Sequence, residues 1–255
     1  MRIKMPTAIL RTTVALFALS PFVMTSAQNA DELPDAESIL DRFIEVTGGA
    51  EAYEDRRSQI VQGTMSITAA GISGAITVYQ EADDFYTSIE LPGVGIVESG
   101  VKDGVAWEHS LLQGARIKSG VERAQAVREA TLNASVRWRE LFPEVETAGM
   151  ETIDGEDAYQ VVMTPEEGGP QSIYFSIDSG LAVRTDMVAA SQMGDIPLQV
   201  TMADYVEFGG ILMPTTMTQS LAGQSIRISF ESTEVNVDIP DEQFDLPAAV
   251  AALLE

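Results

Sequence analysis

The feature of the sequence that most constrains the fold is a run of alternating apolar and polar residues between Gly155 and Ile239. Six segments of this run repeat the alternation, and short turn sequences such as Asp178-Ser179-Gly180 and Gly209-Gly210 separate them. A period of two is typical of strands with one buried face, and closely spaced turn signals join such strands into hairpins. The run therefore predicts six consecutive antiparallel strands that share one apolar face.

An earlier block, from Val61 to Trp107, shows the same alternation with different residues and predicts five more strands. Its turn signals are Ala70-Gly71, Ala82-Asp83-Asp84, Pro92-Gly93 and Lys102-Asp103-Gly104. Together the blocks predict about ten to eleven strands in one sheet. No long linker of Pro, Ser or Gly separates them, so we expect a single domain over residues 28–255.

Two helical regions interrupt the strands. The first begins after Asp35, a good helix cap, and ends at Gly48-Gly49; a short second turn follows over residues 50–57. The second region covers residues 120–141 and is preceded by a loop, residues 109–114, that contains two leucines. The Ala/Leu-rich C-terminal tail is expected to form either a short closing helix or a frayed end.

The N-terminus has the pattern of a secretory signal peptide. Arg2, Lys4 and Arg11 supply the positive start, an apolar core follows over residues 12–23, and small residues lead to a cleavage point after Ala27. The apolar core is shorter than the ~20 residues of a spanning helix and contains a proline, which favours a cleaved signal over a membrane anchor. We expect the mature chain in the periplasm of a bacterium with two membranes.

The composition excludes several classes of partner and chemistry. The formal charge is −24, and removal of the signal peptide, with its three cations and no anion, makes it −27. Nucleic acid binding needs clustered cations, so we expect no nucleic acid partner. The chain has no cysteine, which excludes disulfides, thiol catalysis and a lipid-modified N-terminal cysteine.

The sequence also lacks the usual signatures of an active site or a metal centre. His109 is the only histidine, and no Gly-x-Ser-x-Gly elbow accompanies it. The densest group of carboxylates lacks the spacing of a calcium loop; it consists of Asp238, Asp241, Glu242 and Asp245. We expect no catalytic residue, metal or cofactor, although the many carboxylates leave a paired-acid glycosidase open.

The apolar face of the sheet is too large for the expected helices to cover. Ten strands spaced by about 4.8 Å give a width of about 48 Å, whereas a helix with its side chains is about 10–12 Å across. Large open sheets curl, and a curled sheet either fills its interior with side chains or keeps a cavity. Both a filled half-barrel and a half-barrel with an apolar cavity are compatible with the sequence.

Inward-facing apolar residues of the strands are the candidates to line such a cavity. Alternation assigns ten residues to this face: Met65, Ile67, Ile76, Val78, Phe85, Ile89, Trp107, Phe175, Leu198 and Phe230. A one-residue error in the phase of a strand would turn its side chains to the other face. Methionines on or near several strands favour a deformable interior, because their side chains adapt to irregular apolar partners.

Three segments, residues 38–49, 102–108 and 172–184, resemble those of secreted bacterial proteins related to the outer-membrane lipoprotein-sorting family, the LolA/LolB-like carriers. The resemblance extends over residues 34–247. It implies an α+β fold in which one large curved antiparallel sheet forms a half-open barrel and helices cover its concave face. It also implies that arginines hold the helical lid, for which Arg56 and Arg57 are the nearest candidates.

The function that follows from the resemblance is that of a soluble, non-enzymatic periplasmic carrier, or chaperone, in the trafficking of outer-membrane lipoproteins or lipids. Its expected partners are a lipid or an acylated lipoprotein, together with a transient membrane-protein donor or acceptor. An envelope sensor or protein-interaction module with a filled barrel is the alternative. An enzyme with acidic catalytic residues is a third hypothesis.

Overall fold

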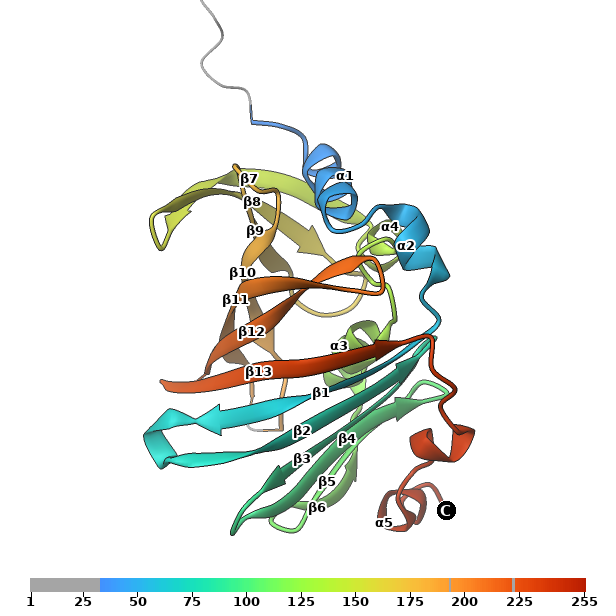
Figure 1. Cartoon of the computed structure of the whole chain (residues 1–255). Coiled ribbons are helices and arrows are strands. Elements are labelled where there is room, and N and C mark those ends of the chain that lie inside the picture. Colours follow the sequence, from blue (N-terminus) through green and yellow to red (C-terminus); the bar gives the residue numbers. More distant parts are fainter. Residues whose placement is uncertain (1–32, 193, 222) are drawn as a thin grey trace, which may run out of the picture. The chain divides into compact units, whose positions relative to one another are not determined.

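Thirteen strands form one antiparallel sheet in the computed structural model, which describes residues 33–255 apart from residues 193 and 222. The spatial order is β6-β5-β4-β3-β2-β1-β13-β12-β11-β10-β9-β8-β7, so each half of the chain is a meander and the halves meet where β1 pairs with β13 (Figure 1). The strands are β1 (Ser58–Ile67), β2 (Ile72–Glu81), β3 (Asp84–Leu91), β4 (Gly95–Lys102), β5 (Val105–Ser110), β6 (Gly114–Ile117), β7 (Glu144–Ile153), β8 (Glu156–Thr164), β9 (Gln171–Ser176), β10 (Ala182–Ala189), β11 (Ile196–Phe208), β12 (Ile211–Leu221) and β13 (Gln224–Val235). The expected signal peptide, its cleavage point after Ala27 and residues 28–32 lie outside the described residues.

The sheet contains more strands than the ten to eleven expected from the sequence. The six strands expected after Gly155 are present as β8 to β13, but β6 and β7 were missed. β6 has only four residues and begins at a glycine within the expected leucine loop. β7 exposes most of its side chains, so its alternation carries little apolar signal. Both are the end strands of the sheet, which remains open in the described part of the chain.

The helices are short, with at most eleven residues each. They are α1 (Ala36–Val46), α2 (Ala50–Asp55), α3 (Gly120–Ala130), α4 (Trp138–Leu141) and α5 (Ala248–Ala251), with 3₁₀ turns η1 (Thr68–Ala70) and η2 (Asp241–Phe244). Asp35 caps α1 as expected, because its Oδ1 accepts a hydrogen bond from Ser38 N at 2.8 Å. None of the helices within the described residues is long and apolar enough to cross a membrane.

A close approach between α1 and the sheet fixes the C-terminal end of this helix. Leu212 N, in β12 just after the β11–β12 turn, donates to Thr47 O at the end of α1 at 2.9 Å. Gly48 follows with φ +136°, and a Cβ at this position would lie 2.2 Å from Gly210 O. Only glycine fits, because any side chain would displace the helix end from the turn.

The single helical region expected over residues 120–141 is broken into α3 and α4. Asn133 adopts a left-handed backbone conformation, φ +58°, between the two helices. Just before it, Leu132 N donates to Ala82 O at 2.9 Å instead of to a carbonyl of α3. The helix therefore ends because its connector is hydrogen-bonded to the β2–β3 turn.

The register of the strands places α1, α3 and α4 on the same face of the sheet. α1 and Trp138 of α4 pack on Val161, Phe175 and Ala182. α3 packs through Ala126, Val127 and Ala130 on Phe85, Val101 and Ala106. We call this the inner face. Residues that pair across neighbouring strands point to the same face of the sheet, so the register shows that the residues under α1, α3 and α4 share this face. The other, outer face is covered at β3 to β6 by η2 and α5.

Candidate functional site

An apolar pocket with a volume of about 220 Å³ lies on the inner face, between α1, the segment 134–142 and strands β8 to β11. None of its lining residues is charged, and the polar ones are Ser135, Gln171 and Thr185. The apolar lining residues are Leu40, Phe43, Ala134, Trp138, Phe142, Met163, Ile173, Phe175, Ala182 and Met202. Such a lining suits an apolar guest, and it contains no carboxylate or imidazole that could act as a general acid or base.

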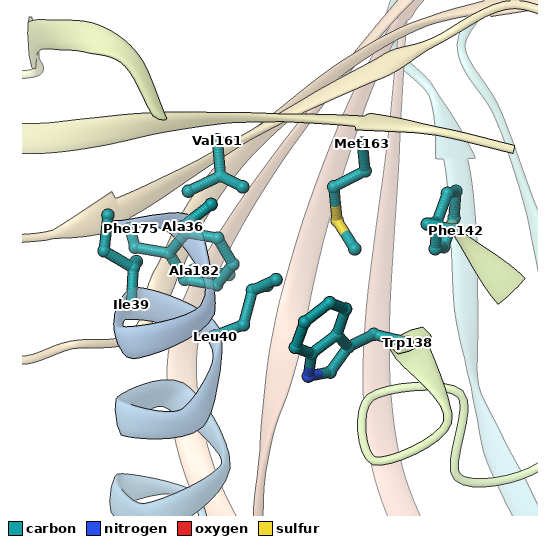
Figure 2. Packing of buried hydrophobic residues seen from close by; sticks show 9 residues of the cluster. All are labelled: Ala36, Ile39, Leu40, Trp138, Phe142, Val161, Met163, Phe175 and Ala182. Atoms are coloured by element: carbon teal, nitrogen blue, oxygen red, sulfur yellow. The ribbon is translucent and has the colours of Figure 1, made fainter. Parts of the chain in front are cut away.

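The wall of the pocket is part of the main apolar cluster (Figure 2). Figure 2 shows Leu40 of α1 and Trp138 of α4 turned toward Met163 of β8. Phe43 and Phe175 lie with ring centroids 5.4 Å apart and planes inclined by 58°. Burial of each of these large side chains contributes about 1.5–3 kcal/mol, so the same contacts hold α1 in place and shape the pocket.

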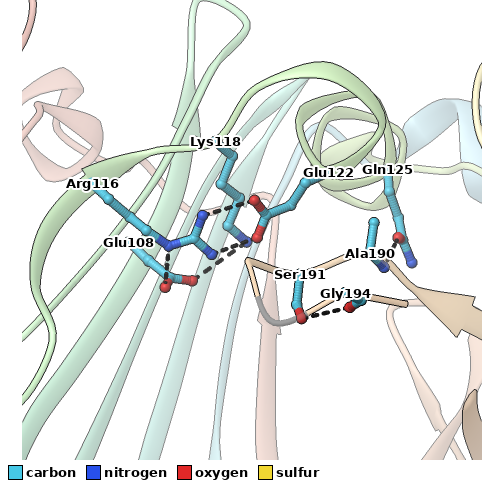
Figure 3. Close-up of polar contacts among 8 residues, drawn as sticks. All are labelled: Glu108, Arg116, Lys118, Glu122, Gln125, Ala190, Ser191 and Gly194. Atoms are coloured by element: carbon cyan, nitrogen blue, oxygen red, sulfur yellow. Dashed lines mark hydrogen bonds and ion pairs between the residues drawn. The ribbon is translucent and has the colours of Figure 1, made fainter. Parts of the chain in front are cut away.

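Ion pairs bind α3 to strands β5 and β6 of the first half of the sheet (Figure 3). Arg116 of β6 donates to both carboxylate oxygens of Glu122 on α3 and also to Glu108 of β5. The Glu122 hydrogen bond and then that of Glu108 raise the pKa of Arg116, and the Arg116 hydrogen bond lowers the pKa of Glu122. These side chains are less than one-third exposed, so the ion pairs are screened less than surface pairs.

α3 is also bound to the second half of the sheet. Gln125 Oε1 accepts a hydrogen bond from Ala190 N at 3.1 Å, just beyond β10 (Figure 3). Arg128 Nη1 donates to Glu167 O in the β8–β9 turn at 3.3 Å. The helix therefore contacts segments from both halves of the meander and acts as a cover over the inner face.

A buried chain of polar side chains fixes the C-terminal end of this cover. Arg56 donates through Nε to Asn133 Oδ1 at 2.7 Å and through Nη1 to Gln59 Oε1 at 3.3 Å. Gln59 Nε2 donates to Gln80 Oε1, and Gln80 Nε2 donates to Ala130 O, both at 2.7 Å. Arg56 has no carboxylate ion pair among the described residues, and burial lowers its pKa.

Of the two arginines that the resemblance suggested, Arg56 joins the sheet to the α3–α4 connector. The side chain of Arg57 is exposed, and this residue contacts Asn236 through its backbone N–H.

The structure places nine of the ten predicted lining residues on the inner face. Residues that pair directly, or that lie two positions apart on one strand, point to the same face. By this rule the register places on the inner face Met65, Ile67, Ile76, Val78, Phe85, Ile89, Phe175, Leu198 and Phe230. Phe175 also lines the pocket. Trp107 pairs with Gly100 and lies on the outer face, where it is 1 % exposed. The assignment of the ten to ligand binding stays a prediction.

Of the thirteen lining residues, the sequence prediction included only Phe175. It missed those from the helices and connectors and also six on strands: Met163, Gln171, Ile173, Ala182, Thr185 and Met202. Leu40 and Phe43 belong to the apolar stripe of α1, and Trp138 stands in the second helical region. The signal that could have found them is the apolar stripe itself, since a helix that covers a sheet presents this stripe to the same interior. Ser135 and Gln171 carry no such signal.

Histidine and the carboxylate cluster lie apart from the pocket. On the outer face, His109 Nδ1 is 3.2 Å from Glu98 Oε2, and Tyr86 donates to Glu98 Oε1 at 2.7 Å. Burial and the Glu98 carboxylate raise the pKa of Tyr86 to about 12. The acidic group from Asp238 to Asp245 surrounds η2, and no three His, Cys, Asp or Glu side chains within residues 33–255, residues 193 and 222 aside, are placed to hold a metal.

The Arg116–Glu122 pair predicts an acid-dependent loss of stability. The folded-state pKa of Glu122 lies below its unfolded value, so its contribution is complete above about pH 5 and is lost as the pH falls through the folded pKa. We expect Glu122→Gln to cost about 1 kcal/mol at pH 7 and less at pH 3. Urea unfolding across this range measures the difference, with the exposed Glu51→Gln as control. A cost independent of pH would contradict the prediction.

Comparison with known proteins gives similarities in structure. No family model matches the chain, and no curated protein matches it. A DUF1329 family protein from Desulfovibrio piger superimposes with a TM-score of 0.58 at 16% identity, covering 84% of this chain and 98% of that chain. A LolA superfamily protein from Nitrosomonas europaea gives 0.57 at 15% identity, covering 84% and 99%. The chain thus has the fold of LolA superfamily proteins, as the resemblance to the lipoprotein-sorting family predicted.

Proposed function

We propose that residues 28–255 form a single-domain periplasmic carrier or binding protein that holds an acyl chain of a lipid or lipoprotein on its inner face. The signal peptide of residues 1–27 would direct its export. In this function the protein performs no covalent chemistry, needs no cofactor and binds no nucleic acid. It receives and delivers its cargo through transient contacts with membrane-protein donors or acceptors.

The uncharged pocket between α1, α4 and β8 to β11 carries the proposal. An acyl chain gains about 0.8 kcal/mol for each methylene that it buries, and the lining has no ionised side chain that its arrival would desolvate. The shared fold with the Nitrosomonas europaea protein supports the proposal through architecture alone.

Release requires two states of the cover that differ in affinity for the cargo. Besides the apolar contacts of Ala126, Val127 and Ala130, α3 and its connector are held by polar bonds to separate segments of the chain. These bonds involve Arg116, Gln125, Arg128 and Asn133. Polar contacts exchange with water at small net cost, about 0.5–1.5 kcal/mol for each hydrogen bond. The cover is therefore the element that we expect to move, while the apolar cluster under α1 stays packed.

Organic extraction of the purified protein followed by mass spectrometry tests the proposal directly. Recovered lipid, or saturable uptake of a fluorescent fatty acid, supports carriage. Clean extracts from several preparations, together with no uptake of the fatty acid, would overturn it.

Filling the pocket provides a site-directed test. Thr185 lines the pocket from β10, so Thr185→Phe places a ring in the volume that a guest would occupy. We expect fatty-acid affinity to fall at least about tenfold, with a stability change of no more than about 1–3 kcal/mol. Fluorescent fatty-acid titration and urea unfolding measure the two quantities. Thr218→Phe is the matched control, because Thr218 pairs with Thr201 and Arg227 on the outer face; equal effects of the two variants would refute the assignment.

A further inference from the structure

One end of the pocket is polar and the other is apolar. Gln171, Ile173 and Phe175 line the pocket from alternate positions of β9, and four residues of strand span about 13 Å. Phe175 lies beneath Phe43 of α1 at the apolar end. Gln171 lies at the other end, where β9 begins after the β8–β9 turn.

Arg128 of α3 stands at the polar end. Its guanidinium carbon is 5.4 Å from the ring centroid of Phe142, which lines the pocket. Arg128 and Gln171 also line a small recess beside Gly168 and Gly169, so Gln171 is common to the recess and the pocket. The guanidinium is therefore next to the pocket, although it is absent from the pocket wall.

The charge of Arg128 is incompletely compensated by the protein. Its one hydrogen bond to a described residue is the 3.3 Å contact with Glu167 O, whereas a guanidinium has five N–H donors. It forms no ion pair with a carboxylate of the described residues; Glu129, the nearest in sequence, accepts instead from Gln125 Nε2 at 3.1 Å. Burial lowers the pKa of Arg128, which records the cost of desolvating this cation. The Glu129 carboxylate attracts this charge through space, but its hydrogen bond is to Gln125 and not to Arg128.

We propose that the pocket takes a single-chain amphiphile with an anionic head group, whose chain points toward Phe175 and whose head group is bound by Arg128 and Gln171. This inference rests on the proposed function. A carboxylate or a phosphate matches the guanidinium fork, because its oxygens accept parallel N–H bonds, and the Gln171 amide supplies further donors. The volume of about 220 Å³ is below the ~300–1,000 Å³ of common ligand pockets and suits one chain better than several.

The negative charge of the whole protein does not oppose this binding at the site. Repulsion between exposed charges is screened beyond about 8 Å at physiological ionic strength. A head group in contact with Arg128 interacts at hydrogen-bond distance in a half-buried environment, where attraction is stronger than in water.

The test compares three ligands with the same chain: laurate, dodecyl phosphate and dodecanol. Displacement of a neutral fluorescent probe gives each affinity. We expect the full chain to bind both anions at least about tenfold more tightly than the alcohol, and Arg128→Gln to remove this preference without weakening dodecanol binding. Arg128→Lys should retain part of it. Arg227→Gln, which removes an exposed cation on the outer face, should change none of the affinities.

The outcomes separate this inference from the proposed function. Equal affinity for all three ligands in the unaltered protein, or a preference for the anions that survives in Arg128→Gln, overturns the role of Arg128 and leaves acyl binding standing. Absence of binding to any of the three overturns both. A preference for only one anion supports the inference and identifies the head group. If Arg128→Gln fails to fold, the comparison of laurate with dodecanol in the unaltered protein and in Arg128→Lys decides.

Discussion

Phe175→Ala is expected to lower the free energy of unfolding by about 3–5 kcal/mol and to weaken acyl binding at least about tenfold. The ring is 2 % exposed, packs against Phe43 and lines the pocket. It also lines a second cleft of about 210 Å³ beside α1, so we expect its removal to join the two spaces. Urea unfolding and fatty-acid titration measure the two effects.

Phe244→Ala is the matched control for this substitution. Phe244 is also 2 % exposed, but it lies in η2 on the outer face beside Lys102. We expect a similar loss of stability and no change in acyl affinity under conditions where both variants are folded. Equal loss of affinity in both would show that binding follows general stability and not the pocket wall.

Arg56→Met is expected to cost about 2–4 kcal/mol and to loosen the connector between α3 and α4. Methionine retains apolar bulk but removes the donors to Asn133 Oδ1 and Gln59 Oε1. Each buried acceptor left without a partner costs about 1–3 kcal/mol. Hydrogen exchange followed by mass spectrometry should show faster exchange over residues 126–138, and bound fatty acid should dissociate faster because the cover opens more often.

Arg57→Met is the control for the cover, since it removes the adjacent arginine, whose side chain is exposed. Its backbone bond to Asn236 is unaffected by the substitution. The expected stability change is within about 0.5 kcal/mol, with unaltered exchange over residues 126–138. If the two variants exchanged alike, the buried polar chain would have no role in holding the connector.

The central strands of the sheet were predictable because most of them bury chiefly one face; β5 is the exception, with Ala106 buried on the inner face and Trp107 on the outer face. The alternation in β8 to β13 and in β1 to β5 follows directly from that burial, and the resemblance then indicated a curved sheet with helices on its inner face. β6 and β7 were not predictable in the same way, because an end strand pairs on one side and β7 leaves most of its side chains exposed. The break at Asn133 depends on contacts with Ala82 and Arg56, which no local pattern shows.

Trp107 shows how alternation can assign a strand residue to the wrong face. Alternation placed Trp107 on the inner face, yet Ala106 is the residue that faces α3, where it packs near Ala130. The small Ala106 side chain permits this close approach. Trp107 is buried on the outer face, where η2 and α5 pack against β3 to β6. A cover supplied by a tail about 140 residues later in the chain is invisible to a periodicity argument.

Neither the pocket nor the residues that line it followed from the sequence alone. The excess of apolar strand surface over helix surface indicated a curled sheet, but it left a filled interior and an apolar cavity equally open. Which strands stay uncovered depends on where α1 and α4 settle, and that position is set by long-range contacts such as Gly48 with Gly210 and Arg42 with Asp178. The helices consequently contribute to the pocket wall, and most of the predicted strand residues lie elsewhere on the inner face.

The edge strand β7 is acidic, and its charge affects how copies of the protein can pair with one another. An open sheet leaves unpaired backbone groups along both margins, which invites polymerisation through edge-to-edge pairing. Here one margin is only four residues long, and the other carries Glu144, Glu146 and Glu151 with a bulge between Thr147 and Gly149. Two copies docking along β7 would bring like charges together and meet a mismatch in spacing. The two margins of the sheet therefore disfavour edge-to-edge pairing between copies of the protein.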